Sequence, residues 1–165
     1  MPKTTSFSTK RLVSDAVFIA LYVALSFASV RIGGFKLTIA ALPTVLCAVV
    51  CGPVDAMLVG LLGAFLEQLL TYGVTPTTAL WILPPAVRGL TVGLLAAPQL
   101  RRRRYPLFFA LCVAAGLLVS CGNTLAFYVD AKLYHYYEYH VIFGVFFERL
   151  LIGAATSLLT AAPVL

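Results

Sequence analysis

Six apolar stretches, separated by short polar or turn-forming segments, dominate the chain. Because about 20 apolar residues in a helix cross the hydrocarbon core of a bilayer, each stretch predicts a transmembrane helix. The separators carry the glycine, proline and charged residues typical of turns. The pattern predicts an all-α integral membrane protein, a bundle of six transmembrane helices in a single membrane domain over residues 1–165. The expected segments are 12–30, 37–52, 55–73, 79–98, 106–129 and 141–163.

The overall composition strengthens this interpretation. Of the 165 residues, 61% are hydrophobic and 11% are charged, whereas an ordinary soluble domain is about half apolar and about a quarter charged. Six crossings leave no room for a soluble domain beside them. The cysteines lie in apolar stretches without CxxC spacing, which favours small packing residues over a disulfide or a metal site. These cysteines are Cys47, Cys51, Cys112 and Cys121.

The distribution of basic residues predicts the orientation of the bundle. With the N-terminus in the cytoplasm, the cytoplasmic segments hold Lys3, Lys10, Arg11 and the run Arg101–Arg104, while the outer loops hold Arg31, Lys36 and Lys132. Cytoplasmic loops carry an excess of Lys and Arg. Seven cations against three therefore predict that both the N-terminus and the C-terminus are cytoplasmic.

A row of alanines marks one side of the first segment. Ala16, Ala20, Ala24 and Ala28 recur at every fourth position, and this spacing places them along one stripe of a helix. Small residues allow another helix to approach closely within a membrane. The stripe is therefore a candidate surface for contact with another protein.

The fourth segment contains Pro84, Pro85 and Arg88. Proline suits the first turn of a helix, so we expect the segment to break here and a short helix to begin near Pro85. The preceding residues, 72–83, would then be irregular backbone lining a cavity. Arg88 would lie one turn inside the new helix, where the helix dipole and a guanidinium converge on an anion such as a carboxylate.

Other polar and aromatic residues surround this opening. Tyr72, Thr77, Thr78, Trp81 and Tyr128 are either aromatics and hydroxyls at the membrane interface or groups that contact a flat ligand. The Asn123 side chain either makes a hydrogen bond to another helix or contacts a ligand. Glu67 and Arg149 are ionisable groups within segments, and a structural ion pair is as good an interpretation as ligand binding.

Catalytic motifs are absent from the sequence. It contains no HExxH motif, no nucleophile with a nearby base and no phosphate-binding GxxxxGK[ST] loop. The chain is therefore not expected to be an enzyme, to bind ATP or to need a cofactor. If it transports a solute uphill, the energy must come from elsewhere.

Four stretches of the chain match a known pattern in order and spacing. They are KLTIAALPTVLCAVVCGPVDAMLVGLLGAFLEQLLTYG (36–73), TPTTALWILPPAVRGLTVGLL (75–95), NTLAFYVDAKLYHYY (123–137) and FERLLIG (147–153). Together with the alanine row, they resemble the substrate-binding S components of energy-coupling factor (ECF) transporters, closest to the folate-type group.

This resemblance implies a multi-pass protein of the bacterial cytoplasmic membrane that captures a vitamin at the outer face. Its partners would be a transmembrane coupling subunit and two cytoplasmic ATPases, with docking through Ala16, Ala20 and Ala24. Folate or a related carboxylate-bearing vitamin is the expected ligand. The substrate would lie under the loops around 31–36, 72–81 and 130–140.

The sequence pattern and the resemblance together give a set of residues that we expect to bind substrate. We expect Arg88 to hold the carboxylate and Trp81 and Tyr72 to stack on the ring system. The full set is Arg31, Lys36, Glu67, Tyr72, Thr77, Thr78, Trp81, Arg88, Asn123, Tyr128 and Arg149. The alternative function is a stand-alone secondary carrier driven by an ion gradient, with Glu67 as its proton-coupling group.

Overall fold

The computed structural model describes residues 9–32, 35–144 and 146–164, with the side chains of 30–32, 35–37 and 141 outside this description. It is helical, as expected. The helices are α1 (Thr9–Phe27), α2 (Ala41–Val50), α3 (Pro53–Tyr72), α4 (Thr78–Thr91), α5 (Ala97–Arg101), α6 (Tyr105–Leu133), α7 (Tyr139–Phe143) and α8 (Phe146–Ala161). A π-helical turn, Val92–Ala96, joins α4 to α5, and a short 3-10 helix, Ala162–Val164, follows α8.

Four of the described helices are long and apolar enough to cross a membrane. These spans are Pro53–Tyr72, Thr78–Arg101, Tyr105–Leu133 and Phe146–Val164. The second span joins α4, the π-helical turn and α5 into one continuous helix. Helix α2 is apolar but has only 10 residues, so it does not cover the whole of the expected segment 37–52.

A two-stranded hairpin precedes α2. Strands β1 (Val30–Ile32) and β2 (Phe35–Leu37) pair antiparallel, with Arg31 opposite Lys36. The sequence did not predict it, because a three-residue strand is too short to show an alternating pattern. Strand β2 ends at Leu37, the first residue of the expected second segment, and the helix begins only at Ala41.

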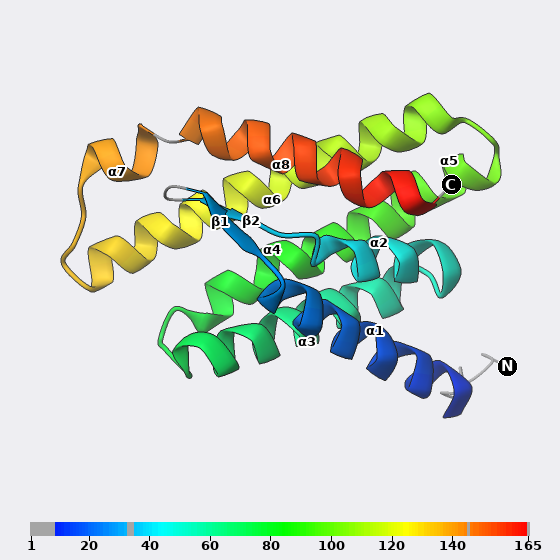
Figure 1. Ribbon diagram of the computed structural model, residues 1–165, viewed down its shortest axis with the longest axis horizontal. Helices are drawn as coiled ribbons and strands as arrows, with labels where there is room; N and C mark the ends of the chain where they lie inside the picture. The colour runs from blue at the N-terminus through cyan, green and yellow to red at the C-terminus, as the bar shows by residue number, and fades with distance from the viewer. Residues whose placement is uncertain (1–8, 33–34, 145, 165) are drawn as a thin grey trace, which may run out of the picture.

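The helices pack in the series α1, α3, α4, α6 and α8, with α4 between α3 and α6 (Figure 1). Helix α2 contacts α1, α3, α4 and α8 and so closes the bundle. The start of α1, the end of α8 and the Arg101–Arg104 turn lie at one end of the bundle (Figure 1). The hairpin, the turn between α3 and α4, and α7 lie at the other end.

Glycines allow α3 and α4 to pack with their main chains in contact. A Cβ atom at Gly60 would lie 2.4 Å from the carbonyl oxygen of Pro85, and one at Gly89 would lie 2.2 Å from that of Ala56. Gly93 meets Pro53 in the same way, at 2.4 Å from its Cα. Small residues at a helix interface permit this approach within a membrane. We call these contacts the α3–α4 glycine seam.

A core of buried apolar residues, most of them small, fills the end of the bundle that holds the glycine seam. It includes Cys47, Ala56, Val59, Val92 and Phe108, each no more than 1% exposed. A smaller cluster of Tyr22, Ala40 and Ala64 lies elsewhere along α1 and α3. One end of the bundle is thus densely packed, and the polar cavity described next lies beyond it.

Candidate ligand-binding site

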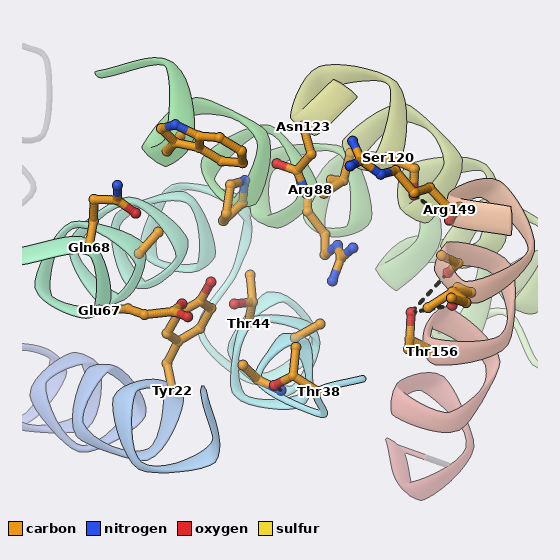
Figure 2. Close-up of a pocket in the computed structure, with 18 of the residues that line it drawn as sticks. Tyr22, Thr38, Thr44, Glu67, Gln68, Arg88, Ser120, Asn123, Arg149 and Thr156 are labelled. Atoms are coloured by element: carbon orange, nitrogen blue, oxygen red, sulfur yellow. Dashed lines mark hydrogen bonds between the residues drawn. The ribbon is translucent and has the colours of Figure 1, made fainter. Parts of the chain in front are cut away.

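A cavity of about 400 Å³ lies between the helices and is polar on several sides. This volume is within the range of small-molecule sites, about 300–1,000 Å³. Its wall takes side chains from five long helices and from α2 (Figure 2). The principal polar and aromatic lining residues are Tyr22, Thr44, Glu67, Gln68, Tyr72, Trp81, Arg88, Asn123, Arg149 and Thr156.

Arg88 reaches the cavity from α4. Its Nε is buried and has no hydrogen-bond partner among the residues that the structure describes. A buried N–H group without a partner is unfavourable, because it has lost its hydrogen bond to water and gained none in exchange. Arg88 is therefore suited to receive an anionic ligand.

A second guanidinium faces the same space. Arg149 extends from α8, and its Cζ lies 4.7 Å from the centroid of the Phe127 ring. Arginine stacks on aromatic faces in this way while its N–H groups stay available. Figure 2 shows Arg88 and Arg149 entering the cavity from different helices, and Asn123 also lines it. Two cations therefore lie on the same side of the cavity.

The opposite side carries acceptors and a phenol. Glu67 and Gln68 are consecutive on α3 and both line the cavity. Tyr22, from α1, is 6% exposed and points into the space beside Glu67 (Figure 2). The cavity thus has a cationic side and a side rich in hydrogen-bonding oxygens, which suits a ligand with distinct anionic and donor-bearing parts.

The expected break at the double proline is wrong. Helix α4 begins at Thr78 and runs through Pro84 and Pro85 without interruption. Tertiary packing overrides the local preference, because Gly60 of α3 contacts the Pro85 backbone and Gly122 of α6 lies against the Pro84 ring. Prolines are tolerated in membrane helices when neighbouring helices surround the freed backbone.

This correction changes the electrostatic basis of the site. Arg88 lies in the last turn of α4 rather than one turn inside its start. The helix dipole and free N–H groups expected at Pro85 therefore do not contribute to anion binding. The positive charge comes from the guanidinium groups of Arg88 and Arg149 themselves.

A second chamber of about 390 Å³ adjoins the first. Gln68, Tyr72 and Trp81 line both chambers and so form the wall that the two share. The second chamber also takes Thr77, Phe127 and Asp130, with Tyr134 and Tyr136 from the segment after α6. It is predominantly aromatic and lies at the hairpin end of the bundle.

A hydrogen-bonded group closes one wall of the second chamber. The Thr77 hydroxyl donates to Asp130 Oδ1 at 2.5 Å, and the Tyr136 hydroxyl donates to Asp130 Oδ2. Burial, and then the hydrogen bond to Asp130, raises the pKa of Tyr136 to about 12. The start of α4, the end of α6 and the following loop are thereby joined through one carboxylate.

Six of the residues expected to bind substrate meet at the first chamber. They are Glu67, Tyr72, Trp81, Arg88, Asn123 and Arg149. Thr77 lines only the second chamber, and Thr78 lines neither, since its hydroxyl accepts the Thr75 backbone N–H at 2.8 Å. The side chains of Arg31 and Lys36 lie outside the described residues.

Tyr128 also lies away from both chambers. Its ring packs edge-on against Tyr137, with ring centroids 5.5 Å apart, and lies near Phe143 at 6.2 Å. The Lys132 ammonium lies 4.0 Å from the centroid of Tyr137. This cluster has the character of an aromatic group at a membrane interface.

Sequence reasoning missed four of the principal lining residues, Tyr22, Thr44, Gln68 and Thr156. Tyr22 lies on the first segment, where only the alanine row was identified as a feature. Nothing in the surrounding sequence predicts that its side chain faces a cavity. Gln68 follows Glu67 directly, and two consecutive polar residues inside an apolar stretch were a usable signal. Sequence reasoning also overlooked Asp15 and Asp55, which are both buried.

Comparisons with known proteins agree on the type of protein. The fold is similar to a solved structure described as the S component of a bacterial ECF transporter. The TM-score is 0.68 over 93% of this chain and 92% of that one, at 18% sequence identity. No curated protein matches the chain by sequence. The family model "ECF transporter, substrate-specific component" matches residues 10–163, and the chain therefore belongs to the family of ECF-transporter substrate-specific components.

Proposed function

We propose that this S component captures a flat, carboxylate-bearing vitamin of the folate type in the cavity between α3, α4, α6 and α8. The observation that carries the proposal is the buried Arg88 Nε without a hydrogen-bond partner in the described structure, on the same cavity as Arg149. A ligand carboxylate satisfies these groups through charge-assisted hydrogen bonds, which are stronger than neutral ones.

The remaining lining residues suit a planar heterocycle. Trp81 and Tyr72 separate the two chambers and offer aromatic faces for stacking. Glu67 and Gln68 supply oxygens that accept hydrogen bonds from ring N–H and amino groups. The two adjoining chambers of about 400 and 390 Å³ would together hold a ligand longer than either chamber alone.

The orientation belongs to the same proposal. The bundle forms a single membrane domain with both termini in the cytoplasm, and the chamber lined by Tyr134 and Tyr136 lies toward the outer face. Support comes from the Arg101–Arg104 turn, which shares one end of the bundle with the start of α1 and the end of α8 (Figure 1). Four arginines at that end agree with the positive-inside rule.

Transport requires partner subunits. The chain docks through Ala16, Ala20 and Ala24 to a transmembrane coupling subunit, and two cytoplasmic ATPases supply the energy, so this chain itself is not an enzyme. In support, all three alanines are exposed on α1, and α1 is at the edge of the bundle (Figure 1). A smooth alanine surface allows a partner helix to approach closely.

The ligand is tested by purifying the chain in detergent, denaturing it and identifying any released small molecule by mass spectrometry and ultraviolet absorbance. We expect a stoichiometric pterin-bearing compound. An empty protein that shows no thermal shift with folate would contradict the folate assignment. Uptake by the chain alone in vesicles under a pH gradient would favour the secondary carrier instead.

The role of Arg88 is tested separately by titrating folate and following the emission of Trp81, the single tryptophan of the chain. Arg88→Met is expected to weaken binding by about 10–100-fold, the worth of one hydrogen bond to a charged group. Arg102→Met, at an exposed arginine in the turn after α5, is the matched control and should leave affinity unchanged. Equal affinities in both variants would exclude Arg88 as the carboxylate ligand.

Docking is tested with Ala20→Trp, which should abolish co-purification with the coupling subunit while ligand binding persists. Ala155→Trp places the same bulk at an exposed alanine of α8, which lies on the opposite side of the bundle from α1 (Figure 1). It should co-purify normally. If Ala155→Trp lost co-purification and Ala20→Trp did not, the assignment of docking to α1 would be wrong.

A further inference from the structure

Three potential metal ligands meet where α1 packs against α2, away from the substrate cavity. They are the Asp15 carboxylate, the Cys47 thiol and the Cys51 thiol, and the ligand atoms all lie within 4.8 Å of one another. Cys47 and Cys51 are four residues apart, so they lie on the same face at the end of α2. Asp15 approaches them from α1.

The burial of Asp15 is hard to explain by packing alone. Asp15 is 5% exposed, and its Oδ1 has no hydrogen-bond partner among the described residues. A carboxylate oxygen removed from water without a partner costs free energy. Cys47 is 0% exposed and Cys51 is half-buried beside it. An unsatisfied acceptor therefore faces two thiols in a nearly closed space.

We propose that Asp15, Cys47 and Cys51 bind a thiophilic divalent metal ion of the Zn²⁺ type. Thiolate and carboxylate are both ordinary zinc ligands, at about 2.3 Å for sulfur and about 2.0–2.2 Å for oxygen. Tetrahedral coordination at these bond lengths sets neighbouring ligand atoms ~3.8 Å apart. Small side-chain rotations within the present 4.8 Å cluster achieve this spacing.

The surroundings complete the coordination. Cys51 is partly exposed, so a water molecule reaches the fourth position, as in open zinc sites with three protein ligands. The Ser14 hydroxyl lies 3.6 Å from Cys51 Sγ and donates a hydrogen bond to it once the thiol is ionised. Outer hydrogen bonds of this kind orient metal ligands.

The metal would join α1 to the end of α2, where Ser14 and Cys51 are already in contact at 3.6 Å. Asp15 lies on the same helix as the exposed Ala16, Ala20 and Ala24. A metal bound at Asp15 therefore fixes the orientation of this exposed face relative to α2. This structural role is independent of which substrate the cavity holds.

The test uses the full chain, purified without a polyhistidine tag, kept reduced and stripped of metal with a chelator. Cobalt is the spectroscopic probe, because thiolate-bound Co²⁺ gives a charge-transfer absorption in the near ultraviolet. We expect one Co²⁺ per chain, displacement by Zn²⁺, and one Zn²⁺ retained through gel filtration by elemental analysis. Absence of the thiolate absorption in the wild-type chain would overturn the proposal.

Variants assign the ligands. The double variant Cys47→Ser, Cys51→Ser should lose the absorption, and Asp15→Asn should bind at least about tenfold more weakly. The matched control is Cys112→Ser, Cys121→Ser, which removes the other two cysteines and should bind normally. Trp81 emission and gel filtration show whether each variant is folded. Since Cys51 is half-buried, Cys51→Ser alone provides a folded variant if the double one aggregates. Undiminished cobalt absorption in folded Cys51→Ser would refute the assignment.

Discussion

Arg11 binds Asp55 through two contacts, Nε to Oδ2 at 2.7 Å and Nη2 to Oδ1 at 2.6 Å. The Asp55 side chain is fully buried, so this pair joins the first turn of α1 to the first turn of α3. Removing one partner of such a pair leaves a buried charge uncompensated. Arg11→Met is therefore expected to lower the thermal unfolding midpoint by about 5–10 °C.

The control for this prediction is Lys10→Met, which removes a neighbouring exposed cation and should change the midpoint little. Midpoints are measured in the same detergent by following Trp81 emission with temperature. Asp55→Asn in the Arg11→Met background should recover part of the loss, because an amide is less costly to bury than an unpaired carboxylate. Equal midpoints for Arg11→Met and Lys10→Met would contradict the structural importance of the pair.

The glycine seam predicts an unusual sensitivity to one methyl group. Gly89→Ala should destabilise the fold by about 1–3 kcal/mol or more, because its Cβ would meet the Ala56 carbonyl at 2.2 Å and backbone cannot rotate aside. The comparison is Gly122→Ala, whose Cβ would meet only the Pro84 ring at 3.0 Å. Denaturant or thermal unfolding of both variants measures the difference. A Gly89→Ala variant as stable as Gly122→Ala would contradict main-chain contact between α3 and α4.

Asn123 and Tyr128 are predicted to differ in their effect on ligand affinity. Asn123 lines the same cavity as the two arginines, whereas Tyr128 belongs to the aromatic cluster with Tyr137. Asn123→Ala should weaken ligand binding by about 5–10-fold through the loss of a hydrogen bond. Tyr128→Leu should leave affinity within about twofold. Titration followed by Trp81 emission measures the ligand affinity of both variants. A larger loss of affinity in Tyr128→Leu than in Asn123→Ala would contradict binding in this cavity.

The Tyr136 hydroxyl is predicted to lose its proton at a higher pH than an ordinary tyrosine. Burial, followed by the hydrogen bond to Asp130, raises its pKa to about 12, whereas an ordinary tyrosine titrates near 10. Because the folded pKa is the higher one, the contribution of the protonated hydroxyl to stability is present below pH about 10 and is lost as the pH rises through about 12. The difference in tyrosinate absorbance between wild type and Tyr136→Phe isolates this group.

Asp130→Asn should shift the titration of Tyr136 downward without restoring the ordinary value, because burial is the larger cause. The Thr77 contact to Asp130 weakens in the same variant, so hydrogen exchange in residues 75–78 should accelerate. An unshifted titration in Asp130→Asn would show that the carboxylate does not hold the loop.

The membrane fold was predictable because its signal is long and local. An apolar stretch of about 20 residues is visible in sequence whatever packs around it. The ends of the helices were less visible. Helix α6 continues to Leu133, beyond the expected end at 129, because Asp130 and Lys132 remain helical despite their charge. The hairpin over 30–37 escaped prediction because its strands have only three residues each.

The error at Pro84 and Pro85 has a clear physical origin. The rule that places proline in the first turn considers only one helix, whereas the outcome depends on Gly60 and Gly122 on two neighbours. Six cavity residues were nonetheless identified, since a polar residue inside an apolar stretch stands out on its own. Tyr22 did not stand out, because it lies in the middle of an apolar segment and most of its side chain is an apolar ring.

The glycine seam and the cavity occupy different halves of α3. Contacts at Pro53, Ala56 and Gly60 involve main-chain atoms and lie in the first half, whereas Glu67 and Gln68 lie in the second. On α3, the residues that pack against α4 are therefore different from the residues that line the cavity. Substitutions in the second half can adapt the chamber to a chemically unrelated molecule without disturbing how the two helices meet, so one architecture can diversify into many receptors.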